Sequence, residues 1–248
     1  MTPPIERPAT TEGLFLWVMH RFAEIFGHRA ILKGGMALRL FDCPRSTTDI
    51  DYVFVPHTSK KEIEAEVQSA LQELEDATVD VKLHSTMLRA IVALDEASIQ
   101  VEASVDVECE SEPVATASFA AAHGQPSRVV RVMSGSHALA HKLAAWNERR
   151  LHRDLYDAYF LRTRLGWTPD RGVLESRLGE VRSRLPALRS TRTMSLDRFA
   201  GELRKAAEGL DEDDLLSELA ALLPPEETAG LAARLRATLV GLADGLDR

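Results

Sequence analysis

Two aspartates separated by one residue, Asp49 and Asp51, have a spacing that could bind a metal ion. The segment TDIDYVFVP around them has the composition of a strand, in which alternate side chains lie on opposite faces. Both carboxylates then share one face, and Ile50 and Tyr52 are buried behind them. Two adjacent carboxylates repel each other unless a cation lies between them. Mg²⁺ suits this pair, because it binds a few carboxylates and completes its shell with water and substrate phosphates.

A pair of glycines, Gly34 and Gly35, precedes the aspartates in the sequence. An apolar run leads into the pair, and residues 36–40 after it have a helical pattern. Such a turn lets backbone N–H groups approach a phosphate at the positive end of a helix dipole. Each feature by itself is more often structural, either a simple turn or an exposed strand face. Their combination, with the phosphate turn first and the carboxylates second, predicts a site for a nucleoside triphosphate.

The elements that must position these residues come from a chain of ordinary globular composition. Its 248 residues are 45% apolar, which is enough to bury a full core in two packed subdomains. The sequence has no apolar run of about 18 residues that could span a membrane, and residues 1–13 lack the basic start and apolar core of a signal peptide. We therefore expect a cytoplasmic protein with no membrane partner.

Hydrophobic periodicity predicts an α+β fold with a mixed sheet, flanking helices and a helical C-terminal subdomain. Besides the apolar run at residues 30–32 and the strand at 48–56, the expected strands are residues 79–84, 87–94, 97–107 and 127–133. The expected helices are residues 12–26, 59–76, 137–150, a consecutive one that includes 153–157, 170–185, 195–209, 211–222 and 226–243, with a short one inside 113–126. We expect three parts: a first helix packed on the sheet (residues 1–27), a core (28–112) and a helical subdomain (113–248).

The charge of the chain is unevenly distributed. The net charge is −8, but residues 139–198 hold 13 Lys and Arg against 7 Asp and Glu. Residues 1–138 hold 12 against 20, and residues 199–248 hold 5 against 11. The basic segment, residues 139–198, is where a polyanion would be expected to bind. It lacks the interleaved aromatic residues of a stacking platform for single-stranded nucleic acid.

The glycine and aspartate segments together resemble a known family. Lys33-Gly34-Gly35-x-Ala37-Leu38-Arg39-Leu40, followed by Arg45-x-Thr47-x-Asp49-x-Asp51, is similar to the AbiEii/AbiGii toxin family of nucleotidyltransferases, which includes the MenT-type toxins. That family belongs to the polymerase-β-like superfamily, whose signature is Gly-Gly or Gly-Ser, a short helix and Asp-x-Asp. The resemblance implies a nucleotidyltransferase-type sheet and transfer of a nucleoside monophosphate from an NTP to a hydroxyl group. It also implies that Lys33 and Arg39 bind the nucleotide with the two glycines.

The resemblance further implies a third carboxylate on a neighbouring strand, acting as a metal ligand and as the base for the incoming hydroxyl. The strand at residues 97–107 alternates apolar and polar residues, and its acids include Glu102 and Asp106. A half-buried strand with a polar outer face explains the same pattern without any function. Because the segment around Glu102 is similar to the corresponding strand of the family, we choose Glu102, and Asp106 is the alternative.

A second block of the sequence also resembles the family. It consists of Ala140-x-Lys142-Leu143-x-Ala145 and Arg153-Asp154-Leu155-Tyr156-Asp157. The resemblance implies that Lys142 contacts nucleotide phosphates and that Asp154 lies near the site. On physical grounds, a lysine on a mostly apolar helix either extends to solvent or points to an anion. The aspartates could equally form salt bridges with Arg149, Arg150 or Arg153, and for Asp157 this structural role has about the same weight.

Three possibilities remain open for the acceptor. The family implies a toxin that modifies RNA, most simply the 3′ end of tRNA, and that is neutralised by an antitoxin protein. A second possibility is nucleotidylylation of a small molecule or a protein side chain. A third is a non-catalytic nucleotide-binding module, against which stands the presence of both glycines, both aspartates and the lysine.

Overall fold

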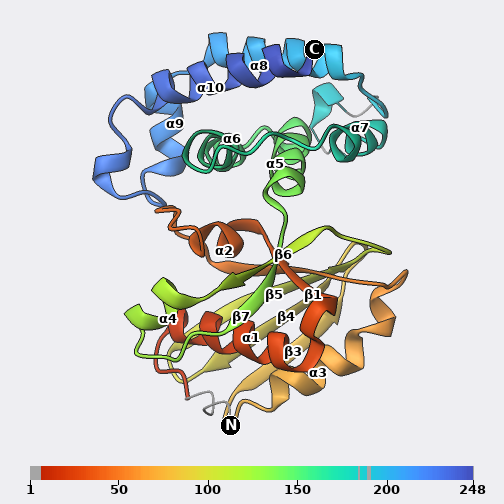
Figure 1. Cartoon of the computed structure of the whole chain (residues 1–248), viewed down its shortest axis with the longest axis vertical. Coiled ribbons are helices and arrows are strands. Elements are labelled where there is room, and N and C mark those ends of the chain that lie inside the picture. The colour runs from red at the N-terminus through yellow and green to blue at the C-terminus, as the bar shows by residue number, and fades with distance from the viewer. Residues whose placement is uncertain (1–6, 184, 189–190, 248) are drawn as a thin grey trace. The chain divides into compact units, whose positions relative to one another are not determined.

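The computed structural model describes residues 7–183, 185–188 and 191–247 (Figure 1). Residues 1–6 of the expected N-terminal part and residue 184 of the expected helix 170–185 lie outside the described residues. The chain divides into two compact units, residues 1–134 and residues 135–248. We call them the sheet unit and the helical unit and describe each by itself.

The described residues of the sheet unit form one seven-stranded sheet in the order β3-β4-β5-β2-β1-β7-β6. Its strands are β1 (Ala30–Lys33), β2 (Asp49–Phe54), β3 (Thr78–Leu83), β4 (Leu88–Leu94), β5 (Ala97–Val105), β6 (Ser111–Ala115) and β7 (Val129–Met133). The sheet is mixed, because β2 runs parallel to β5 and β1 parallel to β7, while the other neighbours are antiparallel. The α+β prediction is confirmed.

Two helices cover one face of this sheet (Figure 1). The first, α1 (Thr11–Phe26), begins where the Thr10 hydroxyl accepts from the N–H of Gly13 and ends at Gly27, whose φ is 56°. The second, α3 (Glu64–Gln72), packs against β3 and β4. Two shorter helices complete the unit, α2 (Gly34–Arg39) and α4 (Ala117–Ala122). The buried face of the sheet and these helices form the core of the unit.

The opposite sheet face, which we call the polar face, carries the residues of chemical interest. Along β5, Ile99, Val101 and Ala103 are buried in the core, whereas Gln100, Glu102 and Ser104 are only partly buried. Along β2, Ile50 and Tyr52 are buried in the same way, and Asp49 and Asp51 alternate with them. The period of two in the sequence therefore sets which side chains reach the polar face.

The division between the units differs from the expected boundary at residues 112 and 113. β6 and β7 both belong to the sheet, with β7 next to β1 and β6 next to β7, and the sheet unit extends to Ser134. The sequence analysis predicted the strand at residues 127–133 but missed β6. Pro113 lies within β6 and cannot donate a ladder hydrogen bond, a feature that is tolerated because β6 is at the edge of the sheet.

The helical unit follows the predicted pattern more closely. Its α-helices are α5 (Gly135–Arg149), α6 (His152–Tyr159), α7 (Arg171–Gly179), α8 (Leu196–Gly209), α9 (Glu212–Leu219) and α10 (Leu231–Leu246). α6 continues into a π-helical turn, Phe160–Arg164. Within the described residues, no helix combines the length and the apolar character needed to cross a membrane.

Candidate active site

The glycine turn between β1 and α2 is packed directly against residues that precede or form β2. Gly34 has a φ of 73°, and a Cβ atom there would collide with Oδ2 of Asp51. A Cβ atom on Gly35 would lie 2.8 Å from Nη2 of Arg45 and 2.8 Å from Oγ1 of Thr47. Both glycines are therefore required, the first for backbone conformation and close approach and the second for close approach alone.

The two aspartates lie on the polar face as predicted, and each has a partner in the sheet unit. Thr47 Oγ1 donates a hydrogen bond to Oδ1 of Asp49 at 2.8 Å. Lys33 Nζ lies 3.9 Å from Oδ1 of Asp51, at the outer limit of an ion pair. The Asp51 side chain remains 21% exposed, so this carboxylate is accessible to a ligand from solvent.

The strand register places five charged residues side by side, one on each of five neighbouring strands. Asp51 is opposite Lys33 of β1 on one side and Glu102 of β5 on the other. Glu102 is in turn opposite Arg89 of β4, which is opposite Lys82 of β3. We call these five residues the charge row. Its centre holds two neighbouring carboxylates, and cations lie on both sides of them.

Glu102 is held in this row by one of its two oxygens. Arg89 donates to Oε1 of Glu102 through Nε at 3.2 Å and Nη2 at 2.8 Å. Gln100 Nε2 donates to the same oxygen at 2.8 Å. From the described residues, Oε2 receives no hydrogen bond. Asp106, the alternative third acid, lies beyond the end of β5, is exposed and is outside the charge row.

The residues present are chemically suited to Mg²⁺. Asp49 and Asp51 supply hard carboxylate oxygens from one strand face, and the missing side chain of Gly34 leaves room for the Asp51 carboxylate. Two carboxylates are a normal protein contribution to a magnesium site that also binds substrate phosphates. Among the described residues, no three His, Cys, Asp or Glu side chains are gathered as a ready metal site. Glu102 as a third ligand therefore stays a prediction.

Arg39, expected at the nucleotide, is engaged elsewhere in the sheet unit. Its Nη1 donates to both carboxylate oxygens of Glu12 on α1 at 2.8 Å, and its guanidinium lies 4.9 Å from the ring centre of Phe119 on α4. These contacts assign Arg39 to the packing of α1 and α4 against α2. Its binding to nucleotide stays a prediction.

In the helical unit, the predicted residues form ion pairs whose carboxylates are buried. Lys142 Nζ lies 2.6 Å from Oδ2 of Asp157, whose side chain is 0% exposed. Arg149 donates to both oxygens of Asp154, at 3.1 and 2.6 Å. Burial raises the pKa of the Asp154 carboxyl, and the charges of Lys142 and Arg149 partly offset this effect. The Arg149–Asp154 salt bridge is one of those that the sequence left open, whereas the pair between Lys142 and Asp157 was not among them. Functional roles for Lys142 and Asp154 stay predictions.

Other cations of the basic segment also have acidic partners, and several of these pairs are exposed. Arg150, with a φ of 57°, stacks on Trp146 and pairs with Glu202 on α8. Further ion pairs join Arg164 to Glu227, Arg171 to Glu175, Arg177 to Glu148 and Arg182 to Glu180. The surface of this segment therefore carries less unpaired positive charge than the sequence count alone indicates.

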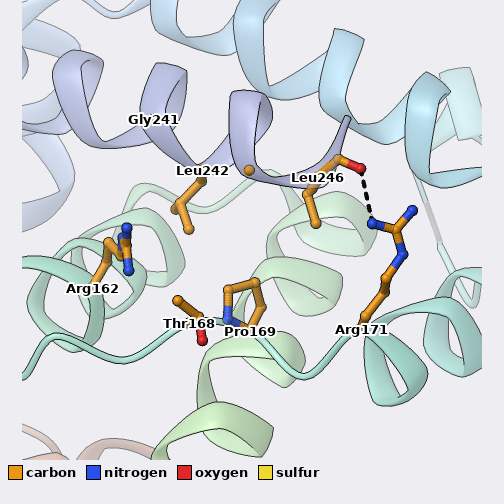
Figure 2. A pocket seen from close by; sticks show the side chains of 8 residues that line it. Arg162, Thr168, Pro169, Arg171, Gly241, Leu242 and Leu246 are labelled. Atoms are coloured by element: carbon orange, nitrogen blue, oxygen red, sulfur yellow. Dashed lines mark hydrogen bonds between the residues drawn. The ribbon is translucent and has the colours of Figure 1, made fainter. Parts of the chain in front are cut away.

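A cavity of about 120 Å³ lies between the α7 start and α10 in the helical unit (Figure 2). Leu242, Leu246 and Pro169 supply much of its lining, and the absence of side chains at Gly241 and Gly245 opens it. Arg171 lines it while donating to the carbonyl of Leu246 at 3.2 Å. None of the residues predicted for the site lines this cavity, so we do not include it in the candidate site.

The sequence analysis missed the residues that hold the carboxylates in place. The sequence assigns Thr47 only to the family motif and predicts no role at the site for Arg89 or Gln100. The position of Arg89 could have been predicted, because the two-residue turn at Asp95 and Glu96 fixes the register of β4 and β5. That register places Arg89 opposite Glu102.

A glycine turn packed against a same-face aspartate pair on a mixed sheet is the arrangement of a nucleotidyltransferase. Consistent with this class, the family model described as "Nucleotidyl transferase AbiEii toxin, Type IV TA system" matches residues 17–244. The chain belongs to this family of nucleotidyltransferase toxins of type IV toxin–antitoxin systems, which confirms the predicted resemblance.

One solved structure supports the fold. The nucleotidyltransferase toxin MenT4 from Mycobacterium tuberculosis H37Rv is similar over 94% of this chain and 83% of its own, with a TM-score of 0.65 and 19% identity. A GTP complex of the CD-NTase CdnG from Bradyrhizobium diazoefficiens aligns over 98% of this chain and 87% of its own at 14% identity. Its TM-score of 0.27 is too low to indicate a shared fold. No curated protein sequence matches the chain.

Proposed function

We propose that this protein transfers a nucleoside monophosphate from an NTP to a hydroxyl group of RNA, with Mg²⁺ bound by Asp49 and Asp51. The observation that carries the proposal is the contact between the Gly34 turn and the Asp51 carboxylate. A phosphate-binding turn and a metal-binding carboxylate in direct contact suit one ligand, a triphosphate with its metal ion.

In the proposed reaction, the hydroxyl oxygen of the acceptor attacks the α-phosphorus of the NTP. A new P–O bond forms, the bond from the α-phosphorus to the bridging oxygen breaks, and pyrophosphate leaves. Backbone N–H groups of Gly34 and Gly35 hold the departing phosphates, and Lys33 offsets their charge. Glu102 accepts the hydroxyl proton through Oε2, the oxygen that the described residues leave without a hydrogen bond. When bound, Mg²⁺ neutralises charge on the reacting phosphates.

RNA as the acceptor, and the 3′ end of tRNA in particular, rests on membership of a toxin family and on the basic segment. We extend this to a cytoplasmic toxin that an antitoxin protein neutralises. The ion pairs of the helical unit favour the second candidate, a small or protein acceptor, because they leave less charge for a polyanion. Residues 135–248 hold 18 Lys and Arg against 18 Asp and Glu.

The experiment is incubation of the protein with Mg²⁺, each of the four α-labelled NTPs and total RNA, followed by gel separation. We expect label in a band of tRNA size with one preferred NTP, and no label with Asp51→Asn. Label on a protein or a small metabolite would instead replace RNA with the second candidate. Absence of any transfer with all acceptor classes would remove the enzymatic proposal itself.

A further inference from the structure

Thr47 joins the glycine turn to the first aspartate. It lies in the loop just before β2 and is partly buried. Its Oγ1 is 2.8 Å from Oδ1 of Asp49 and 2.8 Å from the position of a Cβ atom on Gly35. One hydroxyl group therefore contacts both parts of the candidate site.

The geometry constrains Asp49 in a defined way. A hydrogen bond to a carboxylate is charge-assisted and stronger than one between neutral groups. Threonine is β-branched, so its own χ1 has few alternatives. Its hydroxyl lies 2.8 Å from Oδ1 of Asp49 and 3.3 Å from the backbone carbonyl oxygen of the same residue, so the shorter hydrogen bond is the one to Oδ1. Oδ2 receives no hydrogen bond from the described residues. Oδ2 is thus the oxygen presented to a cation.

We propose that Thr47 is a positioning residue that orients the Asp49 carboxylate for Mg²⁺ and keeps it in register with the phosphate turn. This inference rests on the proposed function, since it assigns a partner to one of the proposed metal ligands. Groups that orient a metal ligand typically change metal affinity or activity by about 10- to 100-fold when they are removed. In this proposal Thr47 acts through its hydrogen bond to Asp49 and not by binding the metal or the substrate itself.

Two substitutions at Thr47 in the full chain separate the hydroxyl from the shape of the side chain, and two further variants serve as control and reference. Thr47→Val keeps the branched shape against Gly35 and removes the donor. Thr47→Ser keeps the donor and removes the methyl group. The matched control is Thr48→Val, because Thr48 is exposed and makes no hydrogen bond with the described residues. Asp49→Asn serves as the reference for loss of the metal ligand.

The main measurement is binding of Mn²⁺ alone, followed by the electron paramagnetic resonance signal of the free ion. We expect Thr47→Val to weaken Mn²⁺ binding by about 10- to 100-fold and to lower kcat by a similar factor. Thr47→Ser should restore both to within about threefold of wild type, because it keeps the donor that orients the carboxylate. Thr48→Val should match wild type, and all four variants should melt close to wild type without metal.

The outcomes distinguish this inference from the proposed function. If wild type binds Mn²⁺, Asp49→Asn does not, and Thr47→Val binds as wild type does, the role of Thr47 is wrong and the metal site stands. If Thr47→Val and Thr47→Ser are equally impaired, the methyl group and not the hydroxyl matters, and the inference is again wrong. If wild type binds no Mn²⁺, or Asp49→Asn binds it normally, the metal pair and the role of Thr47 are both overturned.

Discussion

Two pairs of aspartates, one in each unit, have opposite environments. Asp49 and Asp51 lie on a partly exposed sheet face, whereas Asp154 and Asp157 are 1% and 0% exposed on α6. The buried pair has cations of the chain itself within 2.6 Å, from Arg149 and Lys142. The partly exposed pair has a threonine hydroxyl at 2.8 Å and a lysine no closer than 3.9 Å.

This difference shows which aspartates already have their negative charge balanced by a cation of the chain itself. A buried carboxylate is costly unless it is paired and hydrogen-bonded, so Lys142 and Arg149 are accounted for by the stability of the helical unit. The β2 pair also has Glu102 beside it in register, which adds to the repulsion. Lys33 and Arg89 at the two sides of the charge row reduce that repulsion. The polar face is therefore the place where an added cation brings the larger gain.

The largest effect expected from this comparison is on transfer activity at the sheet unit. Asp51→Asn should lower kcat by about 10³-fold or more, because it removes a ligand of the proposed Mg²⁺ ion. That ion would stabilise the negative charge on the phosphoryl group during transfer. The melting temperature without metal should be unchanged or higher, since one of three neighbouring negative charges is gone. The measurement is single-turnover transfer of label together with thermal unfolding in EDTA. Normal transfer by this variant would eliminate the β2 pair as the metal site.

The helical unit should respond in the opposite sense, with loss of stability. Asp157→Asn leaves the Lys142 ammonium without its buried partner, and removing one member of such a pair costs about 3–5 kcal/mol. The measurement is urea unfolding of the full chain at neutral pH. As a control, the double variant Lys142→Met/Asp157→Leu replaces both charges with apolar groups and should recover most of the loss. A single variant as stable as wild type would contradict the structural role of the pair.

The fold was largely predictable because hydrophobic period and turn residues are local signals. The stripe in residues 12–26 and Gly27 after it predicted α1 and its end, and alternation along residues 97–107 predicted β5. Even the contact between Arg89 and Glu102 could have been predicted from the sequence. Leu94 pairs with Ala97 across a two-residue turn, and five residues further from the turn on each strand Arg89 pairs with Glu102. Asp95 in that turn has a φ of 52°, as such turns require.

Other parts of the site were not accessible from the sequence, because they depend on contacts between distant segments. β2 and β5 are parallel and no short turn sets their register, so the position of Glu102 beside Asp51 appears only in the sheet. The sequence placed Lys142 and Asp157 on consecutive helices without deciding whether they pair. Which side chain satisfies a buried charge depends on tertiary packing.

A smaller effect should separate the two candidate third acids of the sheet unit. Glu102→Gln should lower kcat by about 10²-fold, at the low end for loss of a general base, and leave the KM for NTP nearly unchanged. Asp106→Asn is the matched control, because Asp106 lies outside the charge row and its Oδ1 accepts only from the N–H of Val107 among the described residues. The reverse ranking of the two variants would move the role from Glu102 to Asp106.

The smallest effect concerns the basic segment and asks whether its ion pairs leave any charge for RNA. When a protein binds a single strand, its affinity falls as the salt concentration rises. Each phosphate that the protein neutralises contributes a fall of about 0.7 log units for every tenfold rise in salt. Arg153 is exposed and its side chain forms no ion pair with the described residues, whereas Arg182, 72% exposed, lies 2.7 Å from Glu180. If RNA binds this segment, Arg153→Ala should lower the salt slope by about one phosphate contact, and Arg182→Ala should lower it less.

The measurement is the KM for RNA at several salt concentrations with Mg²⁺ held constant. A wild-type slope near zero would mean that the ion pairs of the helical unit compensate its arginines completely, and the acceptor would then be a small or protein hydroxyl rather than RNA.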